Sequence, residues 1–195
     1  MNKIFSVPVL ITFSLLLFST ALIIHIPAQA KINDTNGGIF KTYMNPTFGI
    51  QMQHPPDWTV AENKNHSVDN IEVVNFSSPV SEDVTVSVDT VNSTTPTTMA
   101  TALKQYVNDS ILSDLKTSPN FKLLEPNTNT TLSGNPAYSI TYTDKDRGGP
   151  YKGMDIVTMK NDKAYDISYT ADPDRYDSVF PTIQTMINSF KITSK

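Results

Sequence analysis

The sequence predicts an α+β fold in which an antiparallel sheet is covered by helices. Two groups of short apolar-alternating segments predict strands, at residues 40–43, 48–54, 71–76 and 84–91, then at 121–124, 137–143, 154–160 and 164–170. One helical pattern separates the groups and another closes the chain. Strands that follow one another directly favour antiparallel pairing, and each amphipathic helix must bury its apolar face on the sheet.

Turn residues mark the ends of several predicted strands. Residues 48–54 alternate apolar and polar side chains until Pro55 and Pro56, which cannot donate to a strand ladder. The segment 84–91 presents Val84, Val86 and Val88 on one face. The pair Asn161-Asp162 predicts a tight hairpin between the last two strands.

The two helices are predicted from apolar spacing of three to four residues. The first begins with a hydroxyl cap and a proline in Thr94-Thr95-Pro96-Thr97 and ends near Lys116. The second runs from about 176 to 190, with Pro181 inside it. Because proline lacks the backbone donor, we expect a kink or a restart of the helix there.

The N-terminus carries the pattern of an export signal. Lys3 precedes an apolar stretch over residues 4–26, and Ala28-Gln29-Ala30 matches a signal-peptidase site, so cleavage is expected after Ala30. The stretch is also long enough for an uncleaved membrane anchor. In both cases the remainder is extracytoplasmic, secreted or tethered. We predict a signal peptide or anchor at 1–30, a flexible leader at 31–39 and one domain at 40–195.

Composition narrows the function of the exported part. It has no cysteine, which excludes disulfides and thiolate chemistry, and without Lys3 it holds 14 Lys and Arg against 19 Asp and Glu, a net charge of −5. No basic run is present, so nucleic-acid binding is not expected. The exported part contains six glycosylation sequons, at Asn33, Asn65, Asn75, Asn92, Asn108 and Asn129.

Three local patterns resemble one known family. They are Gly49-Ile50 leading through His54-Pro55-Pro56-Asp57-Trp58; then Leu132-Ser133-Gly134-Asn135-Pro136-Ala137-Tyr138 with Thr141-Tyr142; and the ending Met186 to Ile192. In their order and spacing they resemble the PsbP-like domain, of the wider PsbP/Mog1-type fold. The resemblance implies an α/β/α arrangement, with an antiparallel sheet sandwiched by helices.

The same resemblance implies a class of function. In plants and cyanobacteria such proteins are extrinsic subunits or assembly factors of photosystem II that help to retain calcium and chloride. The resemblance therefore implies a homologue of those photosystem II subunits, but a fold alone does not fix a function and does not assign their role to this chain.

No catalytic motif is evident, so we do not expect an enzyme. Only His54 and His66 remain after cleavage, and His54 is expected at the surface at the end of a strand. Hydrolase, phosphate-loop and dinucleotide motifs are missing. A hydrolase with an unrecognised site around His54 stays an alternative.

Carboxylates cluster in two places, and one of the clusters is a candidate cation site. Asp144 and Asp146, followed by Gly148-Gly149, have oxygen donors that suit calcium, so a calcium- or small-molecule-binding module is a further alternative. Asp172, Asp174 and Asp177 surround the start of the last helix, where the prediction is helix capping.

The region from Asp144 to Tyr151 is predicted to be a long exposed loop and the main contact surface. Its candidate partner-binding residues are Asp144, Lys145, Asp146, Arg147 and Tyr151, with Trp58 as a second, weaker candidate. Trp58 and the five tyrosines at positions 138, 142, 151, 165 and 169 are otherwise expected to pack in the core or across strands. The sequence therefore predicts an exported, non-catalytic accessory domain that binds an envelope protein or a membrane complex.

Overall fold

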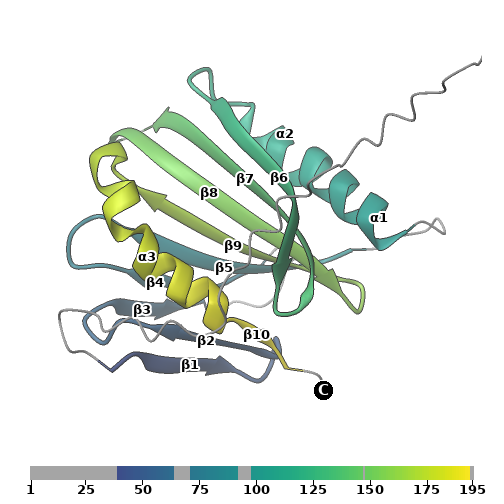
Figure 1. Ribbon diagram of the computed structural model, residues 1–195, viewed down its shortest axis with the longest axis horizontal. Coiled ribbons are helices and arrows are strands. Elements are labelled where there is room, and N and C mark those ends of the chain that lie inside the picture. Colours follow the sequence, from purple (N-terminus) through teal and green to yellow (C-terminus); the bar gives the residue numbers. More distant parts are fainter. Residues whose placement is uncertain (1–38, 64–70, 92–97, 147, 194–195) are drawn as a thin grey trace, which may run out of the picture. The chain divides into compact units, whose positions relative to one another are not determined.

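The computed structural model describes residues 39–63, 71–91, 98–146 and 148–193 (Figure 1). These residues belong to one compact unit that spans 36–195. Its elements are β1 (Lys41–Asn45), β2 (Ile50–His54), β3 (Thr59–Glu62), β4 (Ile71–Ser77), β5 (Asp83–Thr90), α1 (Met99–Tyr106), η1 (Val107–Ile111), α2 (Leu112–Leu115), β6 (Lys122–Leu132), β7 (Asn135–Asp146), β8 (Gly149–Lys160), β9 (Lys163–Ala171), α3 (Pro173–Ser189) and β10 (Lys191–Ile192).

The main sheet is antiparallel and has seven strands in the order β3-β4-β5-β9-β8-β7-β6. Sequential hairpins build most of it, and β9 joins the two strand groups by pairing with β5. Asn161 and Asp162 both have positive φ, which is the geometry of the tight turn predicted between β8 and β9.

Helices lie on both faces of this sheet (Figure 1). The helix α3 covers one face, where Val84, Val86 and Val88 of β5 form a core with Ile183 and other residues of the helix. On the opposite face, α1, η1 and α2 pack on a second core that includes Val157 and Met159 of β8. The alternation of strand side chains therefore supplies two apolar faces, and the predicted α/β/α class is confirmed.

A small sheet of order β1-β2-β10 lies beside the C-terminal end of α3. The backbone nitrogen of Gln53 in β2 donates to Ser189 Oγ of α3 at 2.8 Å, which ties this sheet to the helix. Gly49 has a φ of +65°, and a Cβ there would lie 2.7 Å from the carbonyl oxygen of Thr193. A glycine is therefore required where β2 meets the C-terminal strand.

The strand β3 and the two helical segments differ from the sequence expectations. The strand β3 was not predicted, because its four residues are all exposed and show no buried face. The first helix begins at Met99 with Thr98 as its cap, whereas the predicted start at residues 94–97 lies outside the described residues. The helix α3 does not restart at Pro181, because both Pro181 and Asp177 are exposed and water can satisfy the carbonyl that loses its helical donor.

Candidate functional site

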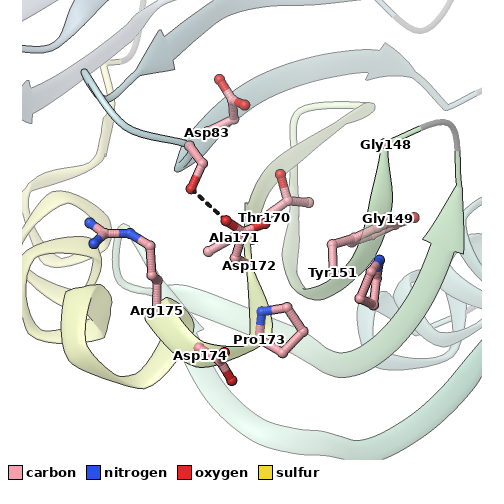
Figure 2. A pocket seen from close by; sticks show the side chains of 12 residues that line it. Asp83, Gly148, Gly149, Tyr151, Thr170, Ala171, Asp172, Pro173, Asp174 and Arg175 are labelled. Carbon is pink, nitrogen blue, oxygen red and sulfur yellow. Dashed lines mark hydrogen bonds between the residues drawn. The ribbon is translucent and has the colours of Figure 1, made fainter.

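An open cleft of about 870 Å³ lies at the end of the main sheet where β9 runs into α3. Three connections that are distant in sequence form its walls (Figure 2). Ser81 and Asp83 lie in the β4–β5 turn and at the start of β5, residues 148–151 in the β7–β8 turn and at the start of β8, and residues 170–175 at the β9–α3 junction. Rigid strands hold all three connections, which is the usual setting of a binding site.

An ion pair between the buried Glu82 and the partly exposed Arg175 supports one wall of the cleft. The carboxylate of Glu82, which is 2 % exposed, accepts a hydrogen bond from Arg175 Nε of α3 and another from Ser78 Oγ. Burial alone would raise the pKa of Glu82, but the hydrogen bonds and the charge of Arg175 outweigh it, so the pKa lies below its usual value. Glu82 therefore stays ionised and fixes Arg175 against the β4–β5 turn.

The other charged residues of the cleft are carboxylates. Ser77 Oγ donates to Asp83 Oδ1 at 2.6 Å, and Ser81 Oγ donates to Asp172 Oδ2 at 3.1 Å (Figure 2). Asp174, in the first turn of α3, is exposed. Arg175 is the one cation among the described lining residues, and its charge is balanced by Glu82, so the cleft is acidic.

Asp172 caps α3 differently from the prediction. It is the N-cap residue, and its carbonyl accepts from the backbone nitrogens of Arg175 and Tyr176 at 2.9 and 3.0 Å. Its side chain makes no capping hydrogen bond and turns instead to Ser81. Asp172 is therefore the N-cap residue, as predicted, but its carboxylate does not cap the helix and instead joins the β4–β5 turn to the start of α3.

Beside the cleft, Lys152 is held by two groups of α3. Its Nζ lies 2.9 Å from Asp177 Oδ1 and 4.1 Å from the centre of the Tyr176 ring. This places the third aspartate of the predicted capping cluster on an exposed face of the helix, in an ion pair with β8. The pair leaves the acidic charge of the cleft uncompensated.

The predicted exposed loop from Asp144 to Tyr151 is wrong, because β7 and β8 continue through most of it. Asp144 pairs with Tyr151 and Asp146 pairs with Gly149, so the connection is short. Asp144 is buried, and its Oδ1 accepts from Ser118 Oγ and from the Lys145 backbone nitrogen, both at 2.6 Å. A contact with the end of the helical segment, invisible in sequence, orders these strand ends.

The candidate partner-binding and metal residues therefore do not form one site. Tyr151 lines the cleft together with Gly148 and Gly149, while Asp144 is committed to Ser118. Arg147 lies outside the described residues, as does the side chain of Asp146. Within the described ranges, no group of three or more acidic, histidine or cysteine side chains is placed to hold a metal. Calcium binding at Asp144 and Asp146 stays a prediction, which calorimetry with calcium would check.

Trp58 belongs to the main core cluster and is buried. Its backbone nitrogen donates to the carbonyl of Pro55 at 3.3 Å, which closes the proline turn. The ring therefore anchors the turn from beneath, as the core interpretation predicts, and offers little surface to a partner.

His54 is buried at 6 % exposure, so its predicted surface position is wrong. Its Nδ1 donates to the carbonyl of Pro55 at 2.8 Å, and its ring centre lies 5.1 Å from that of Phe76. Burial lowers its pKa. The His54 ring packs against Phe76 of β4, a long-range contact that the sequence pattern alone does not reveal. His66 lies outside the described residues.

The sequons fall in different settings. Asn75 is half-buried within β4, where its Nδ2 donates to Thr85 Oγ1 at 2.9 Å, so its amide is already committed. Asn108 is exposed on η1. Asn33, Asn65 and Asn92, and the side chain of Asn129, lie outside the described residues. Glycosylation stays a prediction, and Asn108 is the most accessible of the described sites.

The sequence reasoning missed Ser81, Glu82 and Arg175. Each is an ordinary polar residue in a turn or in the first turn of a helix, and only the pairing of β5 with β9 brings them together. The one signal in the sequence was the acidic residue Glu82 between two apolar-alternating strands. An acidic residue in such a turn is too common to indicate a site.

The chain forms a small α/β/α domain with an acidic cleft at one end of its main sheet. Residues 21–192 match the family model described as PsbP-like protein, so the chain belongs to the PsbP-like family. This confirms the resemblance seen in the sequence. No curated protein matches the chain.

Two solved structures share the fold. The cyanobacterial PsbP, CyanoP, of Synechocystis sp. PCC 6803 is 16 % identical with a TM-score of 0.58, covering 86 % of this chain and 98 % of CyanoP. LpqN, involved in cell envelope biogenesis of Mycobacterium tuberculosis, is 14 % identical with a TM-score of 0.51, covering 81 % and 87 %. At these identities the likeness concerns the fold alone.

Among the helices that the structure describes, none is long and apolar enough to cross a membrane.

Proposed function

We propose that this chain is an exported, non-catalytic PsbP-like accessory domain that binds a protein partner of the envelope or of a membrane complex. The acidic cleft is the contact surface, and a segment bearing lysine or arginine is its occupant. The cleft geometry carries the proposal: three connections on rigid strands converge on one open, negatively charged hollow.

The shape of the cleft favours a protein segment over a small molecule. Small-molecule sites are mostly enclosed and apolar, with few polar groups. Here the hollow is open, and its charged residues are Asp83, Asp172, Asp174 and Arg175. An extended segment can lie across such a surface and leave its backbone in water.

The charges select the chemistry of that segment. Arg175 is balanced by the buried Glu82, and Lys152 by Asp177, so neither compensates Asp83, Asp172 and Asp174. Complementary charge accelerates encounter and disfavours acidic partners. A lysine or arginine of the partner that reaches Asp172 and Asp174 would both accelerate the encounter and select against acidic partners.

A paired charge reversal tests the proposal. The tagged protein carrying Asp172→Lys and Asp174→Lys is used for affinity capture from the native envelope, followed by mass spectrometry. The matched control carries Asp109→Lys and Asp114→Lys, two exposed carboxylates on the helical segment of the opposite face. Both variants change the net charge by the same amount.

We expect the wild type and the control to capture the partner in equal amounts. The amount of partner recovered with the cleft variant should be at least tenfold lower than with the wild type. Lysines at the start of α3 oppose the helix dipole by about 0.3–1 kcal/mol each, so the fold of both variants is checked by circular dichroism. Equal recovery by two folded variants contradicts the proposal.

A further inference from the structure

A polar cluster lies beneath the helical segment α1–η1–α2, on the face of the sheet away from α3. Asp155 of β8 is 4 % exposed, and Asp166 lies on the neighbouring strand β9. Asp155 is opposite Ser168 and Asp166 is opposite Val157, so the two aspartates are diagonal neighbours on one face. Aspartate in the middle of a covered strand is rare unless it is paired.

The residues around Asp155 accommodate its buried side chain by hydrogen bonding. Hydroxyl groups of Ser168 and Tyr142 hydrogen-bond to its carboxyl group. Tyr142 is opposite Gly153 in the β7–β8 register, and a Cβ at Gly153 would lie 2.5 Å from Tyr142 Cζ. The absence of a side chain at Gly153 gives the tyrosine ring the space to lie over β8 and reach Asp155.

Asp166 is less satisfied. Asp166 as a residue is half-buried, but its Oδ1 is buried and, in the part of the chain that the structure describes, has no hydrogen-bond partner. A buried carboxylate oxygen without a donor is costly, and the cost is largest when the group is ionised. A proton on the pair removes that cost, because a protonated carboxyl group can donate as well as accept.

Among the residues that the structure describes, the titratable groups around the pair supply no positive charge. They are Tyr142 of β7 with Tyr151 of β8 beside it, and Tyr106 of α1 with Asp89 of β5 and Asp114 of α2 next to it. Each is an acid or a phenol. Lys104 of α1 is exposed to solvent, away from the buried groups.

Burial raises the pKa of Asp155 to about 6. Burial and the charge of Asp155 raise the pKa of Asp166 well above its usual value. Two carboxyl groups this close titrate as a pair, since the charge of one opposes ionisation of the other.

We propose that Asp155 and Asp166 form a proton-binding pair that keeps one proton at neutral pH and links its release to the packing of the α1–α2 helical segment. The segment is the cover of the pair, and Tyr106 connects the two. Its side chain hydrogen-bonds with Asp89, and it directly precedes η1, a π-helical turn of a kind often found at functional sites. Loss of the proton places a second charge under this cover, and opening the cover lets water reach it.

The pH dependence has a definite sign. A carboxyl group whose pKa is higher in the folded state stabilises the fold below its ordinary pKa, and this stabilisation is lost as pH rises through the folded pKa. The window therefore runs from about pH 4 through the value of about 6 for Asp155 and upward to that of Asp166. His54, with its lowered pKa, acts in the opposite direction near pH 6, so variants that keep His54 are compared with each other.

The test combines carboxyl titration with hydrogen exchange on the folded domain. Carbon-13 NMR follows the side-chain carboxyl groups of Asp155 and Asp166 from pH 3 to 9. Protection factors of the amides in residues 99–115 are measured at pH 5 and pH 8, each relative to unprotected peptide at the same pH. Asp166→Asn removes one partner of the pair, and Asp109→Asn is the control on the exposed side of the same helical segment.

In the wild type and the control, protection is expected to fall by about tenfold between pH 5 and pH 8 on account of Asp155, because its pKa of about 6 lies one unit above pH 5, and to fall further on account of Asp166. In Asp166→Asn the contribution of Asp166 is lost, so the fall is smaller than in the wild type, while the amides of α3 show no such difference between the proteins. Titration of both wild-type carboxyl groups near pH 4 overturns the proposal, and so does an unchanged pH dependence in a folded Asp166→Asn. If that variant does not fold, the wild-type titration decides alone.

Discussion

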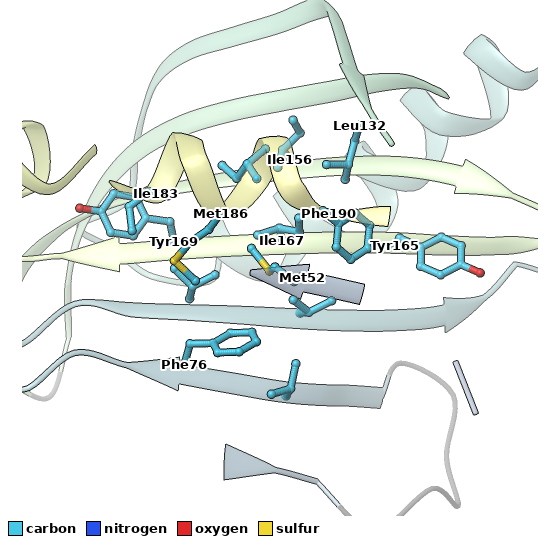
Figure 3. Packing of buried hydrophobic residues seen from close by; sticks show 14 of the residues in the cluster. Met52, Phe76, Leu132, Ile156, Tyr165, Ile167, Tyr169, Ile183, Met186 and Phe190 are labelled. Atoms are coloured by element: carbon cyan, nitrogen blue, oxygen red, sulfur yellow. The ribbon is translucent and has the colours of Figure 1, made fainter. Parts of the chain in front are cut away.

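Replacing Phe190 with alanine removes a buried ring from the contact between α3, the main sheet and the β1–β2–β10 sheet. Phe190 is 2 % exposed and ends α3 directly before β10. It belongs to the same core cluster as Met52 of β2 and Met186 of α3 (Figure 3). Three elements meet at this ring, so the cavity left by truncation cannot close without moving one of them.

Truncation of a buried phenylalanine costs about 3–5 kcal/mol. With a urea dependence of about 2 kcal/mol per molar, the unfolding midpoint is expected to fall by about 2 M. Gln184→Ala, at an exposed position of the same helix, is the control and should stay within about 0.5 kcal/mol of the wild type. A Phe190→Ala midpoint equal to that of the control would show that α3 is peripheral and would refute the sandwich packing.

Three further predictions concern the second core, the cleft and the N-terminus. Gly153→Ala pushes its methyl group into the Tyr142 ring and should cost about 1–3 kcal/mol in urea unfolding, and a stability equal to the wild type would refute this close contact. Glu82→Gln should destabilise the domain at pH 7. The pKa of Glu82 is lowered in the folded protein, so its charge stabilises the fold above the ordinary pKa of a glutamate and this stabilisation is lost on acidification; the difference from the wild type should therefore shrink below pH 4. A difference in stability that does not depend on pH would argue against the ion pair with Arg175. Cleavage is predicted after Ala30, and an intact mass of the native protein that still includes the first 30 residues would favour the anchor.

The sequence predicted the elements whose apolar pattern matches their burial. β5 shows strict alternation of buried valines, and α3 shows helical spacing with Ile183, Met186 and Ile187 buried. The strand β3 has no buried face, so no pattern could indicate it. The polar ends of β7 and β8 were predicted to be a loop for the same reason, because their order comes from each other and from Ser118.

The candidate site was only partly visible in the sequence. Residues 148–151 and the aspartates at the start of α3 were identified separately, one group as a contact surface and the other as helix caps. Their meeting in one cleft depends on β9 lying between β5 and β8, a long-range pairing that no local pattern specifies. The pair Asp155 and Asp166 was missed because two polar residues in apolar strands normally indicate the solvent face.

Site-specific photo-crosslinking in the producing cell tests the central claim, that the acidic cleft holds a protein partner, most directly. A photoreactive phenylalanine analogue is placed at Asp174, on the rim of the cleft, or at Asp109, on the opposite helical face. Adducts from position 174 should be concentrated on one envelope or membrane-complex protein and should be weak or absent from position 109. Adducts that are equal at both positions, or stronger at position 109, would contradict the assignment of the cleft as the binding surface.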